Sequence, residues 1–184
     1  MNSITDKSRK TLKMIDFEKC RITRYPADVL AHKAGMVEEI NDEIHQLVKR
    51  MTEIMIKHKG IGLAAPQAGV PLRLFIISLD GTEQNVKVYI NPIVTPNGKV
   101  GSNEEGCLSV PGVWTKIRRY KKCSVTATDL DGNEFSEEVE GLHARALQHE
   151  YDHIEGITIV NRMTQTARIA HRRQLKKLAE QNNG

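Results

Sequence analysis

The feature that most constrains this chain is a pair of histidines four residues apart, in the segment ALQHEYDHIEGITI at residues 146–159. On an α-helix, residues at this spacing lie on one face, one turn above the other, so His149 and His153 can bind one metal ion. Glu150 lies about 100° around the helix from His149, beside the metal rather than on it. A carboxylate in that place can take a proton from a water molecule on the metal. The segment therefore predicts a metal-binding helix with its own base, although the pattern also arises by chance on surface helices.

A third metal ligand decides between these readings, because a hydrolytic site of this kind needs three protein ligands and one open position. The metzincin proteases place a histidine where this chain has Ile159. The gluzincin proteases use a glutamate farther downstream, where only Glu180 qualifies. Upstream, Cys107 lies in the short Gly- and Pro-bounded segment EEGCLSVPG. Its thiolate with two imidazoles would complete a Cys-His-His site.

Two other functions use the same helix. A metallopeptidase would need a third nitrogen or carboxylate ligand, which the chain does not supply. A non-catalytic metal-binding module would need a closed site with four ligands, and no fourth Cys or His completes a recognisable pattern. The other cysteines, Cys20 and Cys123, fit small buried hydrophobes. Three cysteines do not make a disulfide framework, which favours a reducing compartment.

Three motifs occur in order along the chain: GIGLAAPQ at residues 60–67, EGCLS at 105–109 and QHEYDH at 148–153. Together with ITRYPADVL near the start, they make the region from Ile22 to Met163 resemble the peptide deformylase family. Enzymes of that family remove the formyl group from the initiator methionine of new bacterial and organellar proteins. The resemblance implies a hydrolase that acts on N-formylmethionyl nascent peptides.

The resemblance also implies the metal centre. Cys107, His149 and His153 are expected to hold one divalent ion per chain, usually Fe²⁺ in the family, with Zn²⁺, Ni²⁺ or Co²⁺ as substitutes. The sequence does not choose among these metals, because one sulfur and two imidazoles suit several first-row ions.

The family's mechanism assigns further roles. Glu150 is expected to take a proton from the attacking water and to deliver it to the departing amine of methionine. The side-chain amide of Gln67 and the backbone N–H of Leu108 are expected to stabilise the oxyanion. The small residues around Gly62 let the backbone lie close to the substrate, which would pair with this segment as an added strand.

Residues expected to bind substrate lie within or beside these motifs: Ile61, Gly62, Glu105, Gly106, Gly112, Trp114 and Arg145. Arg145 stands where some relatives have an aliphatic residue that lines the methionine pocket. We expect it to form an ion pair outward, for instance with Glu105. Trp114, the only tryptophan, follows Cys107 by seven residues in the segment that rims the same pocket.

The predicted fold class is α+β, with mostly antiparallel β-sheets packed around a central helix that carries the metal motif. Apolar residues at three- and four-residue spacing predict an N-terminal helix over 37–59, ended by Gly60 at a C′ position. Three strands are predicted over 73–79, 86–92 and 93–101, followed by a hairpin over 122–140 with a type I′ turn at Asp131-Gly132. The metal helix is predicted over 141–155, ended by Gly156, and a C-terminal helix over 163–180.

Three regions are predicted: an N-terminal extension (1–19), expected to be flexible, a catalytic domain (20–163) and a basic C-terminal helix (164–184). After Thr166, Lys and Arg residues outnumber acidic ones five to one, which suits docking on ribosomal RNA or a simple solvated helix. No apolar run is long enough to span a membrane, and DNA is not an expected partner. The expected location is the bacterial cytoplasm, and the basic N-terminus leaves an organelle open.

Overall fold

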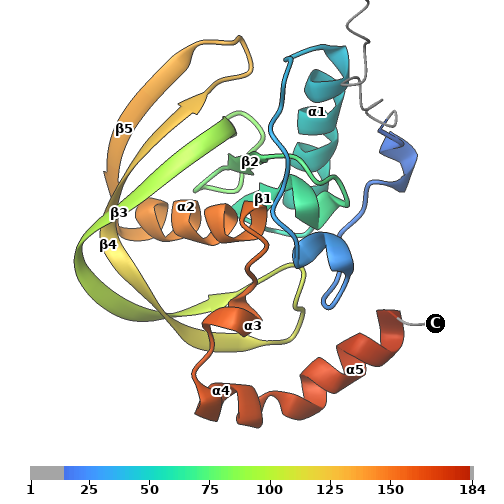
Figure 1. The fold of residues 1–184 in the computed structure, drawn as a ribbon, viewed down its shortest axis with the longest axis vertical. Helices are drawn as coiled ribbons and strands as arrows, with labels where there is room; N and C mark the ends of the chain where they lie inside the picture. The colour runs from blue at the N-terminus through green and yellow to red at the C-terminus, as the bar shows by residue number, and fades with distance from the viewer. Residues whose placement is uncertain (1–14, 183–184) are drawn as a thin grey trace, which may run out of the picture.

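The structure is a computed structural model that describes residues 15–182. A five-stranded antiparallel sheet curves around one central helix (Figure 1). The strands are neighbours in chain order: β1 (Gly62–Ala64), β2 (Leu74–Ile77), β3 (Lys87–Gly106), β4 (Trp114–Thr128) and β5 (Glu134–Glu140). The central helix, α2 (Gly141–Ile154), contacts every one of them. The predicted α+β class, with antiparallel strands around the helix that carries the metal motif, is confirmed.

Shorter helices surround this centre. The N-terminal helix is α1 (Asp42–Lys57), and short 3₁₀ helices are η1 (Phe17–Lys19), η2 (Asp28–Leu30) and η3 (Ala65–Ala68). After α2 come α3 (Ile159–Arg162), α4 (Gln165–Ala170) and α5 (Arg172–Asn182). Among the described residues, no helix combines the length and apolar character needed to cross a membrane.

Three clusters of buried side chains hold these elements together. The first joins α1 to β1 and β2, with Leu47, Met51 and Met55 fully buried. The second packs α2 against the sheet, and the third packs α3 and α5 against the start of β4. Burying each such side chain stabilises the fold by about 1.5–3 kcal/mol. The metal motif therefore stands on a helix that the sheet holds along its length.

The N-terminal helix is shorter than predicted. It begins after Asn41, whose side chain accepts hydrogen bonds from the N–H groups of Glu43 and Ile44, so residues 37–41 are not helical. Gly60 is not its C′ residue. Lys59 takes the left-handed conformation there, with φ 56°. Gly60 serves a close approach instead, because a Cβ on it would lie 2.9 Å from Cδ1 of Leu108.

The strands also differ from the prediction. The two segments 86–92 and 93–101 form one long strand, β3, which β-bulges bend twice without interrupting it. The hairpin between β4 and β5 is confirmed, but its type I′ turn is wrong. Thr128 pairs with Glu134, so residues 129–133 form the loop, and Asp131 lacks the positive φ that the turn needs.

The two chain ends were predicted less well than the centre. The single C-terminal helix is wrong, because His171 separates α4 from α5. Most of the predicted N-terminal extension, residues 1–14, lies outside the described residues. Ile15 and Phe17, which follow it, pack against the first cluster.

Candidate active site

The metal motif lies on the buried α2 helix, as the sequence predicts. His149 and His153 lie one turn apart, with ring centroids separated by 5.1 Å. Gly156, with φ 75°, ends the helix, and the N–H of Ile157 reaches back to the carbonyl of Asp152 at 2.8 Å. This is a Schellman motif, which satisfies the last carbonyl groups and stops the helix just after the second histidine.

Cys107 joins the two histidines, although it is more than forty residues away in sequence. It follows the last residue of β3, and its Sγ lies 3.2 Å from Nε2 of His153. The ligand atoms of Cys107, His149 and His153 all lie within 4.8 Å of one another. Ligands of a tetrahedral metal with one sulfur and two nitrogens are about 3.4–3.6 Å apart. The cluster therefore fits one metal ion.

In the metal-free cluster, the Cys107 thiolate and the imidazole of His149 stabilise each other's charged form. Burial alone would raise the pKa of the Cys107 thiol, but the imidazoles of His153 and His149 bring that pKa well below its ordinary 9.0. Burial alone would lower the pKa of His149, but Cys107 and Glu105 bring it well above 6.5. A thiolate is the form in which cysteine binds metals. Among the described residues, Nδ1 of His153 is buried without a partner.

Glu150 lies beside the cluster without belonging to it. Its side chain is buried, and its Oε2 has no hydrogen-bond partner among the described residues. Burial raises the pKa of Glu150 to about 7, although the imidazoles of His149 and His153 oppose the shift. A carboxyl group with a pKa near neutral can both accept and return a proton.

Gly62 makes room for Glu150. A Cβ at position 62 would lie 2.4 Å from Oε1 of Glu150, closer than any real contact. Gly62 belongs to β1, which is one of the two edge strands of the sheet and pairs only with β2 among the described strands. The other side of β1 is therefore open to an added strand, beside the base.

Two hydrogen-bond donors lie next to Cys107: the side-chain amide of Gln67 and the backbone N–H of Leu108. The side chain of Gln67 is fixed because its Oε1 accepts from the N–H of Ala64 at 2.8 Å. Its amide nitrogen then lies 3.5 Å from Sγ of Cys107 and 3.4 Å from Oγ of Ser109. The N–H of Leu108 has no acceptor within the described part of the chain. The N–H of Leu108 is therefore available to a ligand, and the amide nitrogen of Gln67 is held beside the Cys107 sulfur.

A buried ion network stands behind the metal ligands. Glu105 accepts from Nδ1 of His149 at 3.0 Å, which leaves Nε2 of His149 to face the metal. Arg119 donates to both oxygens of Glu105, at 3.1 Å each, and to Asp152 at 2.5 Å. Arg145 also pairs with Glu105. The expected pairing of Arg145 with Glu105 is confirmed, but it is not turned outward, because Glu105 is buried and the Arg145 side chain is only 12% exposed.

The other predicted substrate residues are spread around this centre. Ile61 precedes Gly62, and its carbonyl accepts from the N–H of Ser78. Gly106 pairs with Trp114 at the end of the β3–β4 ladder. Gly112 is turned toward α5, because the nearest atom to a Cβ there would be Nε2 of Gln174 at 3.1 Å. The structure therefore brings Gly106 to the metal cluster but gives Gly112 a neighbour in the C-terminal helix.

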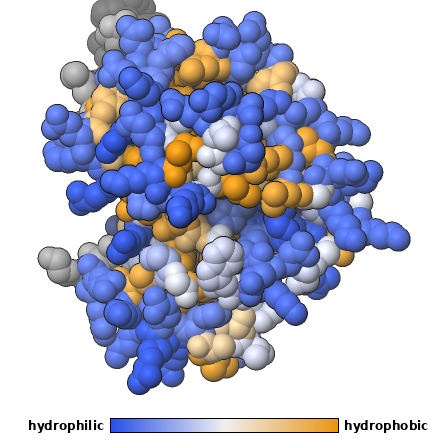
Figure 2. Space-filling model, turned by 180° about the vertical axis from the view of Figure 1, so that it is seen from behind, coloured by the Kyte–Doolittle hydropathy of each residue, from blue (hydrophilic) through white to orange (hydrophobic). Residues whose placement is uncertain are grey.

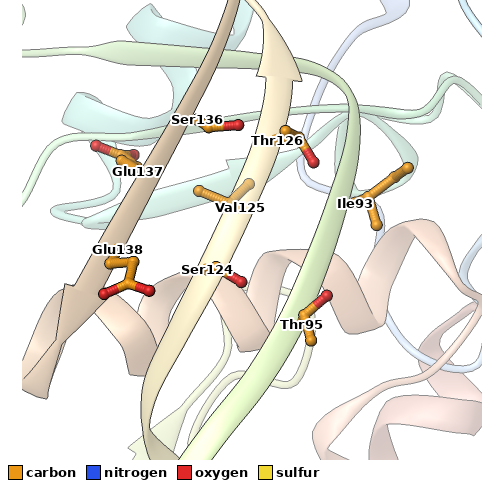
Figure 3. A pocket seen from close by; sticks show the side chains of 8 residues that line it. All are labelled: Ile93, Thr95, Ser124, Val125, Thr126, Ser136, Glu137 and Glu138. Carbon is orange, nitrogen blue, oxygen red and sulfur yellow. The ribbon is translucent and has the colours of Figure 1, made fainter.

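A recess crosses the middle of one face of the molecule (Figure 2). Hydrophobic surface borders it, and hydrophilic side chains surround that border. A separate shallow pocket of about 330 Å³ lies on β3, β4 and β5 (Figure 3). Its lining consists of Ile93, Thr95, Ser124, Val125, Thr126, Ser136, Glu137 and Glu138. Its lining includes none of Cys107, His149 and His153, so it is distinct from the cluster of possible metal ligands.

Sequence reasoning missed three side chains of the site: Ser109, Arg119 and Asp152. Ser109 lies inside the EGCLS motif, so its place beside Gln67 could have been suspected. Asp152 lies between the histidines in the motif QHEYDH. Arg119 had a weaker signal. It is an inward position of a strand in which Ile117 is also buried, and a buried arginine requires acidic partners.

Comparisons with known proteins agree with this geometry. The model of the polypeptide deformylase family matches residues 19–168. The chain is 41% identical over 157 residues to a peptide deformylase of Thermodesulfovibrio yellowstonii, which covers 84% of this chain and 95% of that protein. Its fold is similar to the crystal structure of a peptide deformylase from Legionella pneumophila, with TM-score 0.82, 36% identity, and coverage of 89% and 97%. A peptide deformylase from Plasmodium falciparum gives TM-score 0.85 at 30% identity, again covering 89% and 97%.

Proposed function

The chain belongs to the polypeptide deformylase family, and from that premise we propose how its own residues remove the formyl group from nascent peptides. Enzymes of this family hydrolyse the formyl amide with one metal ion. The observation that carries the assignment of roles is the cluster of Cys107, His149 and His153 beside a buried carboxylate. A metal site with a purely structural role would not require a buried carboxylate without a hydrogen-bond partner, and Glu150 is such a carboxylate.

Cys107, His149 and His153 hold the metal in this proposal, with Glu105 fixing the ring of His149. When bound, the metal lowers the pKa of a water molecule so that hydroxide forms near neutral pH. We propose Fe²⁺ as the resident ion, because the family depends on iron and the thiolate and imidazole ligands suit it. Zn²⁺, Ni²⁺ and Co²⁺ would fit the same ligands.

Glu150 moves the protons. It accepts one from the attacking water and later gives it to the departing amine of methionine. Its pKa of about 7 suits both steps, because neither direction of transfer is strongly uphill at neutral pH. The attack turns the formyl oxygen into an oxyanion. The amide nitrogen of Gln67 and the N–H of Leu108 are the donors that we assign to it.

The peptide is proposed to lie along the open edge of β1, paired with the backbone of Ile61 and Gly62. This strand addition would align the formyl group with Glu150, because Gly62 packs directly against that side chain. Gly106, Trp114 and the aliphatic part of Arg145 are proposed to border the methionine side chain. Gly112 remains a weaker candidate, since its nearest neighbour is Gln174.

The ligand assignment is tested by metal analysis of protein purified without oxygen. We expect one equivalent of iron in the wild type and in Cys20→Ser, which removes a buried thiol that belongs to the first hydrophobic cluster. We expect Cys107→Ser to lose most of the metal. Retention of one equivalent by Cys107→Ser would refute the proposed ligand set.

We also propose that α5 docks on ribosomal RNA. Its exposed Arg172, Arg173, Lys176 and Lys177 form a basic face, while Leu175 and Leu178 pack inward against the third cluster. The third cluster also contains residues of the loop after Cys107, so deleting the helix would disturb that loop. Replacing the basic residues of α5 is therefore the cleaner test of docking. Neutralising the four basic residues to Gln should abolish salt-sensitive co-sedimentation with ribosomes.

A matched control separates docking from general charge. It changes four exposed lysines outside α5 to Gln: Lys49, Lys57, Lys99 and Lys121. Equal loss of co-sedimentation in both variants would count against a specific role for α5. A cytoplasmic location is consistent with this partner and with three unpaired cysteines.

A further inference from the structure

The two histidines of the metal cluster are held in different ways. The ring of His149 is fixed by a carboxylate, because its Nδ1 lies 3.0 Å from Glu105. Nε2 of His153 lies toward the sulfur of Cys107, and its Nδ1 is buried without a partner among the described residues. Metal-binding histidines are usually oriented by a second hydrogen bond on the ring. The position of His153 therefore depends on the backbone turn that carries it.

That turn is the last one of α2, and the segment 31–35 lies against it. The N–H of Ala34 donates to the carbonyl of Ile154, the residue after the second histidine, at 2.9 Å. The same segment is joined to the start of β2, because the N–H of Arg73 donates to the carbonyl of Gly35 at 2.7 Å. Backbone hydrogen bonds therefore bring Arg73 close to the end of the metal helix.

The side chain of Arg73 reaches the same turn. Its guanidinium donates to Oε1 of Glu155, the C-cap residue of α2, at 2.6 Å, and to the carbonyl of Pro92 in β3 at 3.4 Å. It also lies 5.7 Å from the centroid of the Tyr151 ring. The guanidinium therefore contacts α2 both before and after His153 in the sequence, while Pro92 ties it to the sheet.

Glu155 has a second cationic partner, and burial distinguishes the two. Nζ of Lys33 lies 2.9 Å from Oε2 of Glu155, but the Lys33 side chain is 66% exposed, against 9% for Arg73. Water screens the exposed pair, whereas loss of the buried guanidinium leaves a carboxylate uncompensated. We propose that Arg73 is a positioning residue, which holds the last turn of α2, and with it His153, through Glu155. This inference rests on the proposed ligand set.

The test measures the affinity of the folded protein for Co²⁺, by competition with a chelator, and the visible absorption of the bound ion. Arg73→Met should lower the affinity about 10-fold, as expected for a residue that supports a metal ligand. It should also change the absorption spectrum, because one ligand is displaced. Arg73→Lys should recover part of the loss. Lys33→Met, which removes the exposed partner of the same carboxylate, should match the wild type in both readouts.

A double variant separates positioning from a role in stability alone. Arg73→Met leaves Glu155 without its buried partner and should lower the free energy of unfolding. Adding Glu155→Met removes both charges, so this variant should recover stability. It should nevertheless bind Co²⁺ as weakly as Arg73→Met alone, because the two residues act as one unit. Wild-type affinity and spectrum in the double variant would overturn the inference, as would an equal loss of affinity in Lys33→Met.

Failure of the proposed ligand set would give a different result. Cys107→Ser would then bind Co²⁺ as tightly as the wild type. A loss of affinity in Cys107→Ser, combined with unchanged affinity in the double variant of Arg73 and Glu155, would refute the positioning role and keep the ligand set.

Discussion

At the scale of single residues, the site depends on glycines, which leave space that a side chain would fill. Gly62 has nothing beyond its Cα, and the carboxylate of Glu150 occupies the space that a Cβ would need. The same principle holds at Gly60, which leaves room for Leu108, and at Gly106, which leaves room for Trp114. Three glycines therefore make room for the Glu150 carboxylate, for the Leu108 side chain and for the Trp114 indole.

Gly62→Ala should displace the base without removing the metal. The added Cβ, 2.4 Å from Oε1, forces the Glu150 carboxylate away from the attacking water. We expect kcat to fall by about 100-fold, as when a general base is lost from its place, with one metal per chain retained. Gly35→Ala is the control, because its nearest neighbour would be 3.7 Å away. An unchanged kcat would show that the position of Glu150 is not set by Gly62.

At the scale of elements, the site is a meeting of β3, β4 and α2 held by buried charge. Arg119 of β4 bridges Glu105 at the end of β3 and Asp152 of α2. All three side chains are buried, so each relies on the others for compensation of its charge. Through Glu105 this network also holds the ring of His149, and it therefore couples the packing of the sheet to the position of that histidine.

Arg119→Met should destabilise the protein by roughly 3–5 kcal/mol, because it leaves two buried carboxylates without their main partner. Arg118→Met offers a close control. It removes the same charge one residue away, on the exposed face of the same strand, and should change stability by less than about 0.5 kcal/mol. Urea unfolding of both variants measures the difference. Similar midpoints for the two variants would mean that the network contributes little.

The edge strand β5 depends on a second ion pair. Glu137 accepts from Lys87 at 2.6 Å and from the hydroxyl of Tyr89 at 2.9 Å. Burial opposes its charge, but Lys87 and Tyr89 bring the pKa of Glu137 below its ordinary 4.5. A lowered pKa means that the contribution to stability is complete above pH 4.5 and disappears as the pH falls through the folded-state pKa.

Glu137→Gln should therefore lower the melting temperature at pH 7, by about 2–4 °C for a loss near 1 kcal/mol. The difference from wild type should shrink as the pH falls below 4.5. Glu138→Gln, at the neighbouring exposed position, should show no such pH-dependent difference. A gap between Glu137→Gln and wild type that stays constant down to low pH would assign the effect to packing instead of charge.

At the scale of the whole molecule, the features that depend on residues close together in the sequence could be predicted. Those that depend on contacts between distant segments could not. The metal helix was predicted almost to the residue, because Gly156 ends it and its two histidines mark one face. The first half of β4 was not predicted. Its segment KIRRYKK is mostly basic, so the alternation of buried and exposed residues is not visible as an alternation of apolar and polar residues. The partners of Arg119 lie 14 and 33 residues away in the sequence, and no local sequence pattern predicts such contacts.

The same limit applies to the site. Cys107, Glu150 and the histidines could be assigned from motifs and from the resemblance that they carry. The place of Glu105 behind His149, and the flat contact of Trp114 on Gly106, follow from strand register. Register depends on where bulges fall, and β3 contains two irregularities that the sequence does not signal.

The central claim is that this molecule hydrolyses a formyl amide through a metal ion and Glu150. The most direct measurement incubates metal-loaded protein, purified without oxygen, with formyl-Met-Ala-Ser and identifies every product by mass and by a formate assay. We predict formate and intact Met-Ala-Ser, and a loss of about 10²–10⁴-fold in rate for Glu150→Ala with its metal still bound. Cleavage of a peptide bond with the formyl group retained, or an unchanged rate in Glu150→Ala, would contradict the account.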